Sequence, residues 1–252
     1  MASPRNSTTD RPRVFTFYSY KGGVGRSMAL ASVAVLLSAS KHRVLVIDWD
    51  LEAPGIERFF LSGDYAINPE EIRQRSGVTD LAERYTSNRR LDWRECVLEV
   101  PVHASQPPVG LITAGRRDDG YVDRVQGIDW EALFIDNGFG TYLETLRQEW
   151  LSEFDLVLID SRTGMTDIGG ICTINLPDAI VALFAANYQS VEGIADVARR
   201  ARQARSRLPF DRGHLSADEP DVMGQDQADP KDLLYGPGEP CFSVCLETRQ
   251  RN

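Results

Sequence analysis

The sequence is poor in cysteine and histidine, and this shortage excludes several kinds of protein. Its 252 residues include four cysteines, which are scattered along the chain and form no Cys-x-x-Cys pair or zinc-type spacing. The three histidines, His42, His103 and His214, are isolated from one another and from the cysteines. Neither a metal cluster nor a Ser/His/Asp arrangement is therefore expected, and the cysteines are predicted to be reduced thiols in a cytosol.

Long apolar runs are also missing. No stretch approaches the roughly 18 apolar residues of a membrane span, and the polar segment Met1–Arg13 lacks the apolar centre of a signal peptide. The net charge of -9 and the isoelectric point near 4.9 argue against broad nucleic-acid binding by the whole surface, while leaving a local basic patch open. We expect a cytoplasmic protein that does not bind membranes.

What the sequence does contain is an alternation of apolar runs and helical stretches. Short apolar runs typical of buried strands occupy 14–18, 43–48, 109–112, 155–160 and 179–184. Helical patterns occupy 27–40, 77–85, 130–154 and 190–208, and the rest of 62–108 is expected to be loop. This order predicts an α/β fold with a doubly wound, mostly parallel sheet.

Composition divides the chain into three parts. Residues 1–12 form a polar arm, and residues 13–210 form the compact α/β domain. Residues 211–252 are rich in Asp, Gly, Pro and Gln and have little apolar periodicity, which predicts a linker-like or disordered tail. Such a tail is also what the truncated end of a larger protein would look like.

A glycine-rich loop, Lys21-Gly22-Gly23-Val24-Gly25-Arg26-Ser27, joins the first expected strand to the first expected helix. In a P-loop, successive backbone N–H groups and the helix N-terminus close around phosphate oxygens. The common pattern has glycine and lysine where this chain has Tyr20 and Arg26. Arginine keeps the positive charge but is planar and bulkier than lysine, so hydrolysis and binding without hydrolysis both stay open.

Acidic residues follow two of the expected strands. Asp48 and Asp50 follow one apolar run, and Asp160 ends another, immediately before the loop Ser161–Gly164. An aspartate at a strand end before a glycine-containing loop favours a nucleotide-sensing switch. A turn-capping role is the alternative for Asp48, and its motif position makes Asp50 the stronger catalytic candidate.

These motifs resemble the deviant Walker A family of P-loop ATPases, which includes ParA, MinD and the nitrogenase iron protein. Lys21–Ser27 matches six of the seven positions of its signature Lys-Gly-Gly-x-Gly-Lys-Ser/Thr. The resemblance covers Val14–Arg207 and includes Asp48-Trp49-Asp50 as the family's Asp-x-Asp and Asp160 as the Walker B aspartate. Together with Asp50–Gly55 and Asp160–Gly164, the loop is similar to a bacterial subgroup that is often found at the N-terminus of multidomain signalling or conflict-system proteins.

The resemblance implies ATP and Mg²⁺ as cofactors and a homodimer that forms when ATP binds. Nucleotide contacts fall on Lys21, Gly22, Gly23, Val24, Gly25, Arg26, Ser27, Met28 and Asn187. Magnesium would be held by Ser27, by Asp160 through a water, and near Asp48, while Lys21 would reach the partner's phosphates and Asp50 would position the attacking water. The output is a change of partner protein, whose identity the sequence does not specify.

A basic segment, Arg199–Arg207, carries five arginines and no acidic residue. Contact with DNA phosphates, as in a ParA-like DNA-partitioning ATPase, is one interpretation. A solvated helix C-terminus, where cations complement the helix dipole, is the favoured alternative.

Overall fold

The computed structural model of the protein describes residues 13–61, 68–89, 91–135, 138–163, 170–185, 187–205 and 246–247. Its strands form one seven-stranded sheet in the order β3-β4-β2-β5-β1-β6-β7. Only the pair β3–β4 is antiparallel among the described strands, so the prediction of a mostly parallel sheet is confirmed. The strands are β1 (Arg13–Tyr18), β2 (Val44–Asp48), β3 (Leu98–Val100), β4 (Val109–Ile112), β5 (Leu156–Asp160), β6 (Ala179–Phe184) and β7 (Leu246–Glu247).

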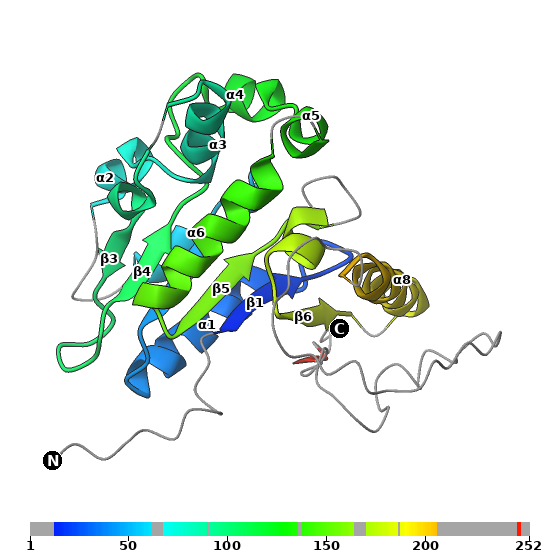
Figure 1. Cartoon of the computed structure of the whole chain (residues 1–252). Coiled ribbons are helices and arrows are strands. Elements are labelled where there is room, and N and C mark those ends of the chain that lie inside the picture. Colours follow the sequence, from blue (N-terminus) through cyan, green and yellow to red (C-terminus); the bar gives the residue numbers. More distant parts are fainter. Residues whose placement is uncertain are drawn as a thin grey trace, which may run out of the picture.

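Helices lie on both faces of this sheet, with α6 crossing one face and α1 behind the other (Figure 1). The α-helices are α1 (Arg26–Ala39), α2 (Pro69–Gln74), α3 (Val78–Thr86), α4 (Tyr121–Gly127), α5 (Trp130–Ile135), α6 (Phe139–Glu153) and α8 (Tyr188–Arg205). Two 3₁₀ turns, η1 (Ile56–Phe60) and η2 (Trp93–Cys96), and a π-helical turn, η3 (Ile171–Asn175), complete the described elements.

The central strand β2 explains why the sheet has two cores. All five of its residues are buried, and successive side chains point to opposite faces. Ile47 packs in the cluster that contains Trp150 of α6, while Val46 packs in the cluster that contains Leu30 of α1. A continuous apolar run is therefore what a strand covered on both faces requires.

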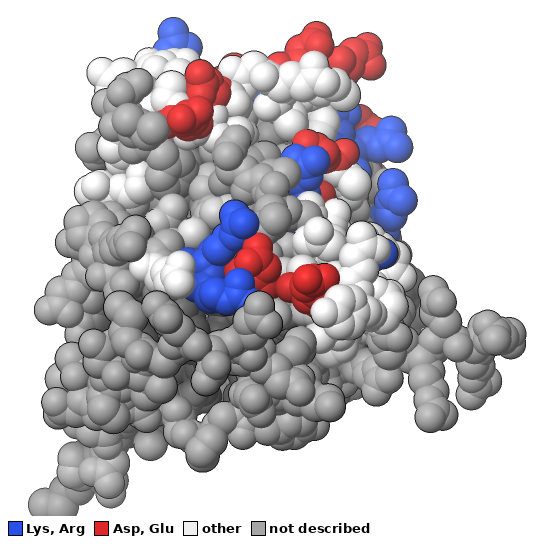
Figure 2. Space-filling view, turned by 90° about the vertical axis from the view of Figure 1, so that its right-hand side faces the viewer, with Lys and Arg blue, Asp and Glu red and all other residues white. Residues whose placement is uncertain are grey.

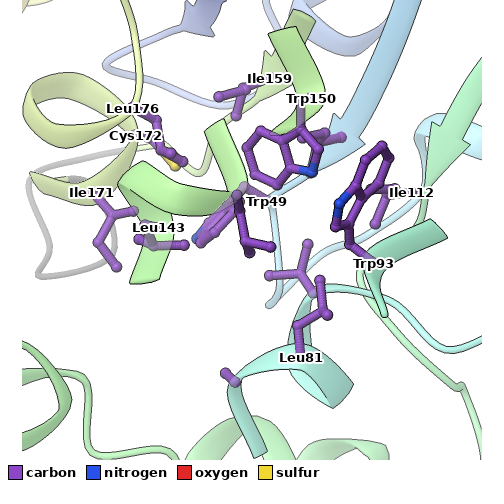
Figure 3. Close-up of a cluster of buried hydrophobic side chains, with 14 of the residues drawn as sticks. Trp49, Leu81, Trp93, Ile112, Leu143, Trp150, Ile159, Ile171, Cys172 and Leu176 are labelled. Carbon is purple, nitrogen blue, oxygen red and sulfur yellow. The ribbon is translucent and has the colours of Figure 1, made fainter. Parts of the chain in front are cut away.

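Tryptophan dominates the core on the α6 side. Trp49, Trp93 and Trp150 lie close to Leu143 and Ile159 in this cluster (Figure 3). Trp49 directly follows β2, so this packing fixes the backbone between Asp48 and Asp50. The core thereby holds in place the segment that carries two of the candidate acids.

Three departures from the expected elements have local causes. The expected helix 130–154 is two helices, because Gly138 lies in the left-handed region with φ of 67° just before α6. Within 62–108 the structure adds α2, whose N-cap Asn68 accepts a hydrogen bond from the Glu70 N–H at 3.0 Å, and the three-residue strand β3. In the stretch expected to be a tail, residues 246–247 form β7 beside β6; residues 211–245 lie outside the described part of the chain.

The two described cysteines, Cys96 and Cys172, are free and buried. Burial raises the pKa of Cys96 to about 12 and also raises the pKa of Cys172, so little thiolate forms in the folded protein. We expect neither residue to react with iodoacetamide at about pH 8, and both to react after unfolding. Peptide-resolved mass spectrometry of native and denatured samples checks this, and rapid native labelling at either site would contradict the packing.

Candidate nucleotide-binding site

The candidate residues meet at one edge of the sheet because three parallel strands end there. In the register of the sheet, Asp160 of β5 lies opposite Phe17 of β1 on one side and Asp48 of β2 on the other. The glycine-rich loop follows β1, so it emerges at the same edge as both aspartates. Carboxyl ends of parallel strands are where α/β proteins place their ligand sites.

The loop has the backbone conformation of an anion cradle. Gly23 and Gly25 have φ of 75° and 82°, a region that side chains with a Cβ atom rarely adopt. Gly25 is the N-cap of α1 and no side chain caps this helix end, which leaves its first N–H groups available to an anion. Val24 is buried in the core cluster and anchors the loop to it, whereas Gly22 is exposed to solvent.

Arg26 points inward to the acids. Its side chain is 7% exposed; Nε donates to Asp160 Oδ1 at 2.6 Å and Nη2 donates to Asp50 Oδ2 at 2.8 Å. Nη1 donates to the Ser19 hydroxyl at 3.4 Å. Although burial opposes the charged form, the two carboxylates hold the pKa of Arg26 above its ordinary value, so the guanidinium is a permanent buried cation.

Ser27 completes the arrangement around Asp160. Its side chain forms a hydrogen bond with the Asp160 carboxylate, which is 2% exposed. Burial raises the pKa of Asp160, whereas Arg26 and Ser27 act in the opposite direction. A buried carboxylate beside a hydroxyl is a donor set that suits a hard cation such as Mg²⁺, so these two residues fit the metal that the sequence implies.

The Asp48 carboxylate accepts hydrogen bonds from the backbone of the loop that follows it. Its Oδ1 accepts the Asp50 N–H at 3.1 Å, and its Oδ2 accepts the N–H groups of Gly55 at 3.0 Å and Ile56 at 3.4 Å. These bonds fold the segment that carries Asp50 back toward β2. A role for Asp48 near a metal stays a prediction; in the structure it shapes the Asp50–Gly55 loop.

The buried Asp48 also predicts a pH dependence of stability. Burial, followed by the charges of Asp160 and Glu57, raises the pKa of Asp48 to about 8. The folded state then binds more protons than the unfolded state, so stability is greatest below the unfolded pKa and falls as pH rises to about 8. We expect Asp48→Asn to flatten this decline, by up to about 1.4 kcal/mol per pH unit. Urea unfolding from about pH 5 to about pH 8 measures both slopes, and equal slopes would contradict the assignment.

The start of α8 lies beside the glycine-rich loop. Lys21 Nζ donates to Gln189 Oε1 at 2.5 Å, and a methyl group added at Gly193 would overlap the Tyr20 ring. Asn187 caps this helix, because its Oδ1 accepts the Ser190 N–H at 2.9 Å. The loop is therefore held between α1 and α8.

The predicted site residues fall into two groups. The structure brings Arg26, Ser27, Asp48, Asp50 and Asp160 into one bonded cluster. Of the remaining predicted residues, Val24 is buried, whereas the exposed ones line the rim. There, Met28 is 56% exposed with its methyl carbon 3.6 Å from the Cβ position of Gly25, while Lys21 and Asn187 belong to the contact with α8.

Sequence reasoning missed several partners of these residues. An ion pair joins Arg162 to Glu52 and so links the two motif loops, and another joins Arg117 to the buried Glu57 below Asp48. Glu52 and Arg162 lie inside the quoted motifs, which was a usable signal. Ser19 carries no signal of its own, since only the fold brings it to Arg26.

The basic segment of α8 is partly neutralised by its own helix. Asp196 forms one ion pair with Arg199 at 2.9 Å and another with Arg200 at 3.0 Å. On the side of the molecule where α8 lies, described basic side chains appear next to acidic ones (Figure 2). The side chains of Arg202 and Arg205 are outside the described part, so contact with DNA stays a prediction.

The profile of the CobQ/CobB/MinD/ParA nucleotide binding domain matches residues 15–210. The chain belongs to this family. Comparison with curated protein sequences finds no significant match.

Solved structures in the same family share the fold. A plasmid partition protein from Borrelia burgdorferi is 19% identical with a TM-score of 0.55, over 81% of this chain and 81% of that one. A ParA family ATPase from Chlorobium tepidum is 20% identical with a TM-score of 0.52, over 76% and 68% of the two chains. MinD from Pyrococcus horikoshii, solved with Mg-ADP, is 16% identical with a TM-score of 0.52, over 76% of this chain and 65% of its own. The chain thus spans just under two thirds of that MinD structure.

None of the helices among the described residues combines the length and apolar character that a membrane crossing requires.

Proposed function

We propose that this chain is a cytoplasmic, Mg²⁺-dependent ATPase whose nucleotide state controls dimerisation and thereby partner binding in a bacterial signalling or conflict system. One observation carries the proposal. A phosphate cradle lies at the N-terminus of α1, and the Arg26 side chain in the same loop forms ion pairs with Asp50 at 2.8 Å and Asp160 at 2.6 Å. Cradle, cation and two acids at adjacent strand ends are the parts that phosphoryl transfer needs.

Each part has a task that follows from its position. The N–H groups of Gly22–Gly25 and the start of α1 would bind the phosphates. Bound Mg²⁺ would supply positive charge to the phosphates, held by the Ser27 hydroxyl and by Asp160. Asp50 is 14% exposed, and its Oδ1 accepts only a long bond from the Ala53 N–H at 3.4 Å, so this oxygen would orient a water at the mouth of the site.

Dimerisation rests on Lys21, which is exposed at the rim and, among the described residues, bonds only a neutral amide, that of Gln189. A lysine that does not neutralise an acid is free to exchange its partner for a phosphate. In the family that the sequence resembles, the matching lysine reaches the nucleotide of the second subunit. We therefore assign Lys21 to the dimer interface.

The oligomeric mass of the chain with and without ATP tests this assignment. We expect Mg-ATP to shift the wild type from monomer to dimer and Lys21→Met to remain monomeric. Lys41→Met is the matched control, because Lys41 is also exposed but bonds the Ser105 carbonyl at the far end of α1. A dimer of Lys21→Met that forms as readily as the wild type would contradict the assignment.

A second candidate is a regulatory module that binds nucleotide without hydrolysing it. The observation that favours it is the same guanidinium, which already occupies Oδ2 of Asp50 and so leaves one fewer carboxylate oxygen for a catalytic water. Tight Mg-ATP binding by the wild type without phosphate release would establish this alternative. Release that depends on Asp50 would exclude it.

A further inference from the structure

The two cations of the glycine-rich loop have opposite environments. Lys21 is exposed and faces an amide, whereas Arg26 is 7% exposed and faces two carboxylates and a hydroxyl. The loop therefore presents one positive charge outward, to an incoming phosphate, and holds the other inside. Such a division is possible because the guanidinium has several N–H donors and can bridge two acids at once.

The Arg26 guanidinium is also the counter-ion of the acids that would approach the metal. Within the described part of the chain, no other basic side chain forms an ion pair with Asp50 or Asp160. Both acids are largely buried, at 14% and 2% exposure, so their charges need a partner close by. The bonds from Arg26 supply that partner in the nucleotide-free chain.

A divalent cation at Asp160 would compete with this arrangement. Asp160 Oδ1 already accepts the Arg26 Nε–H at 2.6 Å, and Ser27 bonds the same carboxylate. A second cation beside a buried guanidinium is repelled, because little water is present to screen the two charges. The anionic phosphates of a nucleotide would remove the conflict by offering the guanidinium, or the metal, an alternative partner.

We propose that Arg26 is a built-in counter-ion that keeps divalent cations away from Asp50 and Asp160 until a nucleotide binds. Arg26 is thus a positioning residue that couples metal binding to nucleotide binding. The inference rests on the proposed function for the identity of the metal position. It goes further in requiring that the nucleotide-free chain has no affinity of its own for the metal at this place.

Binding of Mn²⁺ alone, followed by electron paramagnetic resonance on the full chain without nucleotide, tests the proposal. We expect no saturable binding to the wild type. Arg26→Gln should bind Mn²⁺ at one site, with an affinity at least about 10-fold above any residual binding to the wild type, because two buried carboxylates have lost their cation. Arg26→Gln should also melt at a lower temperature than the wild type and regain part of the loss in Mn²⁺. The double variant Arg26→Gln/Asp160→Asn should lose both responses.

Two further proteins keep the test decisive. Arg43→Gln removes an exposed arginine that pairs with Asp155 at 2.7 Å, and it should behave as the wild type. If Arg26→Gln does not fold, Arg26→Lys takes its place, since one ammonium group reaches fewer acceptors and should leave part of the site open to Mn²⁺.

The results separate this inference from the proposed function. Wild-type protein that binds Mn²⁺ as tightly as the Arg26 variants would overturn the inference, even if the chain is an ATPase. Failure of the wild type to bind ATP would instead overturn the proposed function, and the Mn²⁺ comparison contains no nucleotide. Adding a non-hydrolysable ATP analogue should allow the wild type to retain Mn²⁺, and its failure to do so while the analogue binds would also count against the inference.

Discussion

Replacement of Asp50 by alanine is expected to reduce phosphate release from ATP at least about 100-fold, since a positioned general base typically contributes 10²- to 10⁴-fold. Nucleotide affinity should change little, because the cradle is made of backbone groups that Asp50 does not contact. The fold should also persist, since Arg26 keeps its bonds to Asp160 and Ser19. Steady-state phosphate release and equilibrium ATP binding measure the two effects separately.

The control for this variant is Asp155→Ala. Asp155 immediately precedes β5, at the other end of the strand that carries Asp160, and pairs with exposed Arg43. Loss of that pair should cost at most about 1 kcal/mol of stability and leave turnover intact. If Asp50→Ala retained wild-type turnover, Asp50 would not orient the water, and the role would have to move to another residue.

The second large effect is expected at Gly193, on the face of α8 that touches the glycine-rich loop. A methyl group there would overlap the Tyr20 ring, so Gly193→Ala must displace the residue next to Lys21. Overpacking of this kind costs about 1–3 kcal/mol, against a helix-propensity gain of about 1 kcal/mol. We expect ATP affinity to fall by about 10-fold, because the cradle moves with Tyr20.

A double variant distinguishes this overlap from a general defect of α8. In Tyr20→Ala/Gly193→Ala the ring is gone, so the added methyl group has space and ATP affinity should return toward that of Tyr20→Ala alone. Gly127→Ala serves as the control, because a Cβ atom at this exposed position would meet nothing within 4 Å. Additive losses in the double variant would contradict the contact between Tyr20 and Gly193.

The local parts of the site could be predicted from the sequence. Glycine spacing between an apolar run and a helical pattern defines the cradle, and the structure places Gly23 and Gly25 at positive φ, as such a loop needs. Asp48 and Asp160 were expected at strand ends, and the parallel register brings them opposite each other. These features depend on a few neighbouring residues and on one general property of parallel sheets.

The direction of Arg26 could not be predicted in the same way. Its position suggests contact with phosphates, yet its partners are Asp50, 24 residues away, and Asp160, 134 residues away. Whether the flexible Arg26 side chain contacts phosphates or these two acids depends on packing across three strands. The contact between Lys21 and Gln189 spans 168 residues and is equally invisible in the local pattern.

The most direct test of the account is a calorimetric titration of Mg-ATP into the wild type, Gly22→Val and Gly127→Val. Gly22 and Gly127 are both exposed, and a Cβ atom at either would meet nothing within 4 Å, so both variants should fold. A valine in the cradle blocks the approach of phosphates to backbone N–H groups, so only Gly22→Val should lose at least about 10-fold in affinity. No binding by the wild type, or equal binding by all three proteins, would contradict the assignment of this loop as the nucleotide site.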